Sequence, residues 1–248
     1  MSNIIKIDNL HKKYYSKEGV VVAIDDITLD VVEGEYLSIV GPSGCGKSTL
    51  LNIIGGIDTK SSGKIEMDDN IKIGYMLQND CLFPWLNILD NCLIGLKIEG
   101  NLTEENISYV KELLNTYGLS DFIYKYPSSL SGGMRQRAAL IRTLAIKPDI
   151  LLLDEPFSAL DYQTRLAVSD DVYKIIKETG KTVIMITHDL AEAISMSSRV
   201  VVLTGRPAKV KKIYDIVMKN KSGPIENRKC QEFSIYYDMI WKEIDHYV

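Results

Sequence analysis

Apolar residues along the chain follow two different spacings, and the change between them divides the chain into parts. Residues 4–7 and 20–31 alternate apolar with polar side chains and residues 36–40 are mostly apolar, which together predict a small antiparallel sheet leading into a core. Later strands are predicted at further apolar runs, residues 72–77, 150–153, 182–186 and 200–203. Continuous apolar strands that alternate with helices are typical of a parallel sheet covered on both faces.

Between residue 87 and about residue 145 the apolar spacing becomes that of a helix. The apolar positions are Ile88, Leu89, Cys92, Leu93 and Leu96, then Ile107, Val110, Leu113, Leu114 and Tyr117. This pattern predicts a helical subdomain inserted into an αβ core. The Ser-Ser-Gly sequence at residues 61–63 predicts a turn outside that subdomain.

The composition is that of an intracellular globular protein. The chain has 248 residues, of which 46% are hydrophobic and 25% charged, with a net charge of -4. A mildly acidic chain has no overall attraction to nucleic acid or anionic lipid. Its N-terminus lacks the apolar segment of a signal peptide, and no apolar run reaches the roughly 18 residues of a membrane span, so we expect a protein that does not itself cross the membrane.

The glycine-rich segment after residues 36–40 predicts a phosphate-binding loop that opens a helix. It consists of Gly41, Pro42, Ser43, Gly44, Cys45, Gly46, Lys47, Ser48 and Thr49. Its glycines allow successive backbone N–H groups to face a phosphate, Lys47 would reach the β- and γ-phosphates, and Ser48 would place a hydroxyl on Mg²⁺ with Thr49 behind it. An ordinary glycine-rich turn would leave the adjacent lysine and serine unexplained.

Two further segments carry candidate chemistry. Asp154 and Glu155 end the predicted strand at 150–153, where open α/β sheets bind their ligands, so one carboxylate could hold Mg²⁺ and the other could orient or deprotonate a water. Residues 130–137 are predicted to begin a helix with an apolar face, and Ser131 is a good N-cap for it. The glycine pair that follows would let a second phosphate approach the helix N-terminus, which a simple capped helix start does not require.

These motifs together resemble the ATP-binding subunits of ABC (ATP-binding cassette) transporters over nearly all of residues 3–215. The matching positions are residues 41–49 (Walker A), Gln78 (Q-loop), 130–136 (signature), 150–154 (Walker B), Glu155 (catalytic glutamate), 158–161 (D-loop) and His188 (switch histidine). The resemblance implies a P-loop NTPase fold, with a RecA-like parallel-sheet core, an N-terminal antiparallel β subdomain and an inserted helical subdomain at about residues 87–145. It implies one ATPase domain over residues 1–220, followed by an amphipathic helix in residues 221–248.

The resemblance also implies that the chain hydrolyses ATP to ADP and phosphate. Glu155 would act as general base on the attacking water, and His188 would contact the γ-phosphate. A capping or core histidine at the end of a strand is the alternative for His188, but its place in Thr-His-Asp directly after residues 182–186 favours catalysis.

The implied cofactors are ATP and Mg²⁺. The metal ligands would be Ser48, Gln78 and Asp154. Adenine would stack on Tyr14, with neighbouring Tyr15 as the alternative.

The signature residues Ser131, Gly132, Gly133 and Met134 would contact a nucleotide held by the P-loop of a second ATPase subunit, so that two chains pair head to tail. We expect the second subunit to be the same chain in another copy, with a different cassette as the alternative that the sequence leaves open. Met134 departs from the glutamine that is commonest in the family, and a thioether cannot donate the hydrogen bond of an amide.

The remaining implied partners belong to a transporter. Integral membrane permease subunits would contact the region around Cys81 and Trp85, although ordinary core packing is the alternative for Phe83 and Leu86. A solute-binding protein would be an indirect partner, nucleic acid would not be one, and the subunit would lie peripherally on the cytoplasmic face of the cell membrane.

A narrower resemblance concerns residues 82–91 and 204–207, which are similar to importer ATPases for nitrate, sulfonate and taurine and to subunits for thiamine-precursor uptake. The solute itself is not encoded in these residues. The alternatives are a soluble ABC ATPase acting on another macromolecule, an exporter ATPase, a scaffold without turnover and a nucleoside kinase, the last of which leaves the signature and D-loop unexplained.

The tail carries an apolar stripe at helical spacing. Its members are Phe233, Tyr236, Tyr237, Ile240, Trp241 and Ile244. Such a stripe predicts a helix that packs on its own domain, with a partner-binding helix as the alternative.

Overall fold

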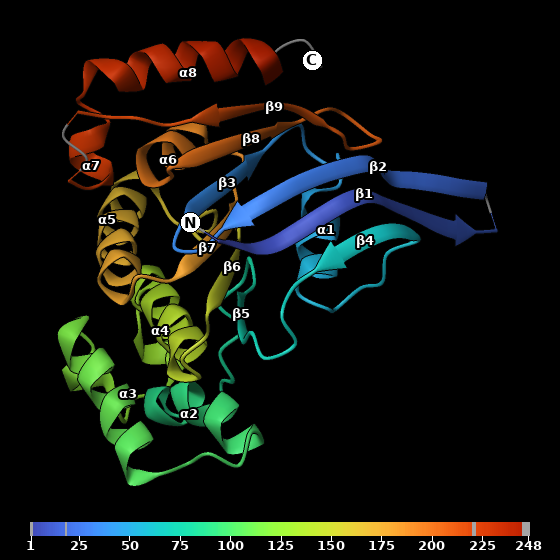
Figure 1. Ribbon diagram of the computed structural model, residues 1–248. Helices are drawn as coiled ribbons and strands as arrows, with labels where there is room; N and C mark the ends of the chain where they lie inside the picture. The colour runs from blue at the N-terminus through green and yellow to red at the C-terminus, as the bar shows by residue number, and fades with distance from the viewer. Residues whose placement is uncertain (1, 18, 220–221, 245–248) are drawn as a thin grey trace. The chain divides into compact units, whose positions relative to one another are not determined.

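The computed structural model describes residues 2–17, 19–219 and 222–244 (Figure 1). The described chain divides into two compact units. The first consists of the chain up to Ile71 together with the chain from Gly180 onward, and the second is Lys72–Thr179. Within the part of the chain that the structure describes, no helix has the length and apolar character that a membrane span requires.

The first unit contains an antiparallel sheet with the strand order β2-β1-β4. Its strands are β1 (Asn3–Ser16), β2 (Gly19–Val32) and β4 (Ser62–Glu66). The prediction of a turn at residues 61–63 was therefore wrong for its last two residues, which begin β4. Gly63 has a φ of 91°, and a Cβ there would overlap the Asn9 backbone, so this glycine permits β4 to lie close against β1.

The first unit also contains a mainly parallel sheet with the order β7-β3-β8-β9. Its strands are β7 (Thr182–Ile186), β3 (Tyr36–Val40), β8 (Arg199–Leu203) and β9 (Val210–Asp215). β3 is parallel to both of its neighbours, whereas β9 is antiparallel to β8. Our assignment of residues 36–40 to the antiparallel sheet was wrong, because every residue of β3 is buried, as in a strand covered on both faces.

The helices of the first unit are α1 (Lys47–Ile54), α6 (Leu190–Met196), α7 (Pro224–Asn227) and α8 (Gln231–Ile244). α8 packs on α6 and β8 (Figure 1). Its Ile240 is fully buried in a cluster with Val40 and Val202, and most of the predicted apolar stripe packs against that cluster. This agrees with a helix that packs on its own domain. Residue 221 and residues 245–248 of the predicted tail segment lie outside the described residues.

The second unit combines a parallel strand pair with helices. The strands are β5 (Ile73–Met76) and β6 (Ile150–Asp154), and the helices are α2 (Ile88–Ile98), α3 (Glu104–Thr116), α4 (Gly132–Ala145) and α5 (Tyr162–Thr179), with short 3-10 turns at Ser120–Phe122 and Pro127–Ser129. Side chains cap these helices at their N-termini: Asn87 for α2, Thr103 for α3, Ser131 for α4 and Asp161 for α5. α4 contacts α2, α3 and α5, and it is therefore the central helix of this unit.

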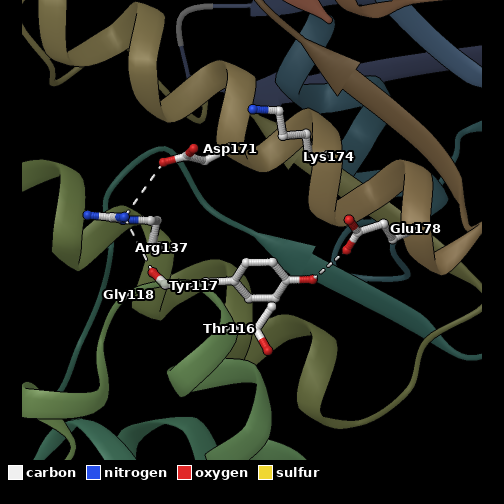
Figure 2. Close-up of a pocket in the computed structure, with 7 residues that line it drawn as sticks. All are labelled: Thr116, Tyr117, Gly118, Arg137, Asp171, Lys174 and Glu178. Carbon is white, nitrogen blue, oxygen red and sulfur yellow. Dashed lines mark hydrogen bonds and ion pairs between the residues drawn. The ribbon is translucent and has the colours of Figure 1, made fainter. Parts of the chain in front are cut away.

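A cavity of about 350 Å³ lies in the second unit among α3, α4 and α5 (Figure 2). Arg137 of α4 donates to the Tyr117 carbonyl at 3.3 Å, and its Nη1 lies 3.6 Å from an Asp171 carboxylate oxygen. The Tyr117 hydroxyl donates to Glu178 at 3.3 Å. Burial, followed by the charge of Glu178, raises the pKa of Tyr117 to about 12. The polar groups around this cavity thus connect the three helices to one another.

Candidate active site

The predicted phosphate loop follows β3 directly and leads into α1. Gly44 and Gly46 have φ values of 70° and 124°, a backbone region that residues other than glycine rarely adopt. A Cβ on Gly46 would also lie 2.8 Å from the Ala23 carbonyl oxygen. Glycine is therefore required here both by backbone conformation and by space.

Lys47 is the first residue of α1 and is 6% exposed. Its Nζ donates to the carbonyls of Gly41 and Pro42 at 2.8 and 2.9 Å and lies 4.0 Å from the Cys45 thiol. Among the described residues no carboxylate lies within ion-pair distance of this ammonium group. A buried charge without a counterion is costly, and an anion bound in the loop would compensate it. The loop therefore fits a phosphate group.

His188 lies at the same edge of its sheet as the phosphate loop, because β3 and β7 are parallel and Ile39 pairs with Ile186. The residues on either side are anchored. The Thr187 hydroxyl donates to Glu192 at 2.7 Å, and the Asp189 carboxylate caps α6. The His188 side chain itself is exposed. The backbone thus holds His188 in place while leaving its ring accessible.

Tyr14 is held more firmly than its neighbour. Its hydroxyl donates to Asp58 at 2.6 Å, and the Lys12 ammonium, which binds the same carboxylate, lies 4.6 Å from the centre of its ring. Burial and then the hydrogen bond to Asp58 raise the pKa of Tyr14, whereas an interaction with the Thr49 hydroxyl of the phosphate loop lowers it. Tyr15 is 76% exposed, against 41% for Tyr14. The contacts therefore favour Tyr14 as the fixed aromatic surface beside the loop.

In the second unit Gln78 and Glu155 meet at the carboxyl ends of β5 and β6, which pair with Met76 opposite Leu153. The Gln78 amide Nε2 donates to Glu155 Oε2 at 3.0 Å. Glu155 has a φ of 46°, which is uncommon for a residue with a side chain and is a form of strain found at functional sites. The contact orients the Glu155 carboxylate through its Oε2 atom.

The donor set suits Mg²⁺. Asp154 is the last residue of β6. The pKa of Tyr75 is raised first by the burial of Tyr75 and then by the negative charge of Asp154. Because Gln78 donates through Nε2, its Oε1 is the atom that suits a cation. With the Ser48 hydroxyl, the three predicted ligands supply only oxygen, which is the donor that Mg²⁺ prefers.

The signature segment opens α4 as predicted, with the Ser131 hydroxyl accepting from the Met134 N–H at 3.3 Å. A Cβ on Gly133 would lie 2.9 Å from Val168 Cγ2 and 3.1 Å from Thr164 Cγ2, both on α5. Gly133 is therefore required for the packing of α4 on α5, a reason that the sequence did not reveal. The half-buried Met134 contributes its backbone to the cap.

The segment after Gln78 is tied to α4 by arginines that the sequence analysis did not single out. Arg142 donates to the carbonyls of Asp80 and Cys81 at 2.6 and 2.7 Å, and Arg135 Nε donates to the Asp80 carboxylate at 3.0 Å. Arg135 lies within the signature segment itself. The signature helix and this segment are thus mechanically connected within the second unit.

The aromatic residues of the same segment are presented at the surface, as expected. Trp85 is 69% exposed and Phe83 36%, and their rings lie 5.3 Å apart. Leu82 is buried, so only part of the run forms a surface. We use the name aromatic loop for the part of this segment that exposes the Phe83 and Trp85 side chains.

Asn91 of α2 organises the aromatic loop and was also missed. It is fully buried and accepts from the Phe83 N–H at 2.7 Å, while its amide donates to the carbonyls of Phe83, Leu86 and Asn87 at 3.0–3.1 Å. The available signal was a polar residue among the apolar positions 88–96 of a predicted helix.

A family profile described as "ABC transporter" matches residues 24–158, which is more than half of the chain. The chain belongs to the ABC transporter family. It is an ATP-binding cassette with ATPase activity, and the predicted P-loop NTPase fold is confirmed.

Curated relatives of this ABC ATPase match it over most of their length. An uncharacterized ABC transporter ATP-binding protein of Bacillus subtilis is 44% identical, covering 98% of this chain and 96% of the relative. A taurine import ATP-binding protein of Jannaschia sp. is 42% identical, covering 86% and 82%. A nitrate import ATP-binding protein of Synechocystis sp. is 37% identical, covering 95% and 93%.

A solved structure is similar as well. It is a dimeric, post-hydrolysis state of an ATP-binding cassette bound to ADP and Pi, with a TM-score of 0.73 and 33% identity, covering 86% of this chain and 99% of the other. The similarity therefore extends to a cassette that was captured with the products of ATP hydrolysis.

Proposed function

We propose that this ABC ATPase is the energy-coupling subunit of an importer, which drives solute uptake through a separate membrane permease. The observation that carries its nucleotide-binding role is the buried Lys47 ammonium, whose partners among the described residues are two carbonyls and a thiol inside a glycine-lined loop. The import role is supported by relatives named for taurine and nitrate import. Nitrate, sulfonate, taurine and a thiamine precursor are the candidate solutes.

ATP is held by the phosphate loop, residues 41–49, with Lys47 moving from its two carbonyl partners to the β- and γ-phosphates. Adenine stacks on Tyr14, whose orientation is fixed by Asp58 and Lys12. Ser48, Gln78 and Asp154 provide the oxygen ligands for Mg²⁺. When bound, Mg²⁺ neutralises negative charge on the phosphate oxygens.

Glu155 acts as general base. The Gln78 amide donates to Oε2 of its carboxylate and so orients the group that takes the proton of the attacking water. The exposed ring of His188 contacts the γ-phosphate from its anchored position after β7. It stabilises the negative charge on this phosphate while the phosphoryl group is transferred to water. The products are ADP and phosphate.

Two copies of the chain close around two ATP molecules in this proposal. Ser131, Gly132, Gly133 and Met134 of one copy supply a helix N-terminus to the γ-phosphate that is held by the other copy. The dimeric state of the similar ADP- and Pi-bound cassette supports this arrangement.

The permease docks on the aromatic loop, and the subunit is peripheral on the cytoplasmic face of the membrane. Exposed aromatic side chains on a braced backbone are suited to anchoring a partner segment. Through Arg135 and Arg142, a displacement of this loop would reach the signature helix. A solute-binding protein would act only through the permease, and nucleic acid has no place in this proposal.

Light scattering behind a sizing column tests the closed dimer. In Glu155→Gln protein, ATP at low magnesium should convert monomer to dimer and ADP should not, because the γ-phosphate joins the two copies. Adding Ser131→Arg should leave ATP bound but block dimerisation. Thr103→Arg is the matched control, since Thr103 caps α3 in the same way that Ser131 caps α4. ATP-driven dimerisation that survives Ser131→Arg would overturn the arrangement in trans.

Co-purification and uptake test the importer role. A small multispanning membrane protein should co-purify with the parent chain and be lost when Trp85 is replaced by Ser. Deleting the gene should abolish uptake of one class among oxyanions, sulfonates and vitamin precursors. Co-purification with ribosomes or DNA instead would favour the soluble alternative.

A further inference from the structure

The last residue of β8 and the turn between β8 and β9, together residues 203–209, lie against the phosphate loop at its three glycines. The neighbouring pairs are Leu203 with Gly41, Arg206 with Gly44, and Ala208 with Gly46. Part of this turn belongs to the run 204–207 that resembles importer ATPases, yet the ATPase mechanism gives it no task. Both segments belong to the first unit.

Arg206 makes the one polar contact of this set. Its Nε and Nη2 both donate to the Gly44 carbonyl oxygen, at 3.2 and 2.9 Å. In a trans peptide the carbonyl and the following N–H point in opposite directions. With the Gly44 carbonyl held toward Arg206, the Cys45 N–H points to the other side, where it lies 3.3 Å from the Pro42 carbonyl oxygen.

That other side is the interior of the phosphate loop, because the Pro42 carbonyl also accepts from Lys47 Nζ at 2.9 Å. The Gly44–Cys45 peptide needs an external hold, since glycine adopts positive and negative φ with similar ease and Gly44 has a φ of 70°. A guanidinium suits the task because it is always charged and its donors have a fixed geometry.

The turn that carries Arg206 is itself braced. The Thr204 hydroxyl accepts from the Lys209 N–H at 2.9 Å, and Ala208 exchanges backbone hydrogen bonds with Ala23 and Asp25 at 2.9 and 3.0 Å. Arg206 therefore extends from a fixed base toward the loop.

We propose that Arg206 is a positioning residue for nucleotide binding: it holds the Gly44–Cys45 peptide so that its amide faces the bound phosphate. This inference rests on the proposed role of residues 41–49 in binding ATP. Arg206 acts through the loop backbone and affects ATP and ADP alike. It therefore changes affinity more than the rate of the chemical step.

The variants Arg206→Met and Arg206→Lys test the proposal, and Lys209→Met is the matched control. Arg206→Met keeps most of the side-chain length but removes the donors, and the exposed position makes misfolding a small concern. Lys209 lies in the same turn, but its ammonium pairs with Asp25 at 2.7 Å.

Titration with a fluorescent ATP analogue and with ADP should give a Kd about tenfold higher for Arg206→Met, equivalent to about 1.4 kcal/mol. The kcat at saturating ATP should stay within about twofold of the parent. Arg206→Lys should recover only part of the affinity, because one ammonium group cannot reproduce the two-donor contact. Lys209→Met should bind like the parent.

Hydrogen exchange of the nucleotide-free protein gives a readout that does not require ATP. The Cys45 amide should exchange at least about fivefold faster in Arg206→Met and at the parent rate in Lys209→Met. Parental exchange in Arg206→Met, or parental affinity despite faster exchange, would overturn the proposal. Full recovery by lysine would also overturn it, since charge alone would then suffice. A parent that binds no nucleotide would instead remove the ATP-binding role, while the exchange comparison still tests the Arg206 contact.

Discussion

Replacing Asn91 by leucine should detach the aromatic loop from α2. The buried Asn91 side chain accepts from the Phe83 N–H at 2.7 Å and donates to three carbonyl oxygens, those of Phe83, Leu86 and Asn87, at 3.0–3.1 Å. An amide group has two hydrogens, so one of these donor contacts is shared. Leucine would fill most of the space but would satisfy none of the backbone groups.

The expected cost follows from these contacts. A hydrogen bond contributes on the order of 1 kcal/mol net, and a buried donor left without a partner costs about 1–3 kcal/mol. Losing the strong contact to the Phe83 N–H and two further bonds should therefore destabilise the protein by about 3 kcal/mol. The matched control is Asn87→Ala, which removes the N-cap of α2 together with the Asn87 hydrogen bond to the Asp90 carboxylate and should cost about 1 kcal/mol.

Guanidinium unfolding measures both costs, and fluorescence shows where the loss occurs. The chain has two tryptophans, Trp85 and Trp241, so Trp241→Phe leaves Trp85 as the single reporter of the aromatic loop. In that background Asn91→Leu should lower the fluorescence anisotropy of Trp85 and Asn87→Ala should not. A midpoint for Asn91→Leu no lower than that of the control, with unchanged anisotropy, would refute the role of Asn91.

Further predictions concern single contacts. Gly133→Ala should lower the free energy of unfolding by about 1–2 kcal/mol, because overpacking against Val168 outweighs the gain in helix propensity, and chemical denaturation measures it. Tyr14→Ala should weaken ATP binding by on the order of 1 kcal/mol while Tyr14→Phe changes it little, as nucleotide titration can check. The folded state raises the pKa of Tyr117 to about 12, so the contribution of Tyr117 to stability should be complete below about pH 10 and lost as pH rises toward 12. A difference ultraviolet titration against Tyr117→Phe measures the pKa of Tyr117 that sets this pH range.

Much of the fold could be predicted because its buried strands are continuous apolar runs. The residues 182–186 and 200–203 were recognised on this basis and are strands beside β3. β4 was missed because Ser62–Glu66 is a mostly exposed edge strand, and its serine and glycine suggested a turn. The sheet to which β3 belongs is decided by pairing with β7 and β8 far along the chain, which local spacing does not encode.

Candidate chemical residues could be named from the sequence because most belong to motifs with their own spacing. The supporting residues could not be named in this way. Asn91 and Arg206 act through hydrogen bonds with backbone groups that lie up to 8 and 162 positions away along the chain. The packing role of Gly133 depends on α5, which approaches α4 only in the folded protein. Such contacts have no local sequence signature.

Steady-state phosphate release by Glu155→Gln tests the central claim most directly. The amide retains an acceptor for the Gln78 N–H but cannot take a proton from water. ATP binding, measured by titration on the same protein, should remain within about threefold of the parent, while turnover falls by at least about 100-fold. Hydrolysis within about twofold of the parent would contradict the assignment of Glu155 as the general base of this ATPase.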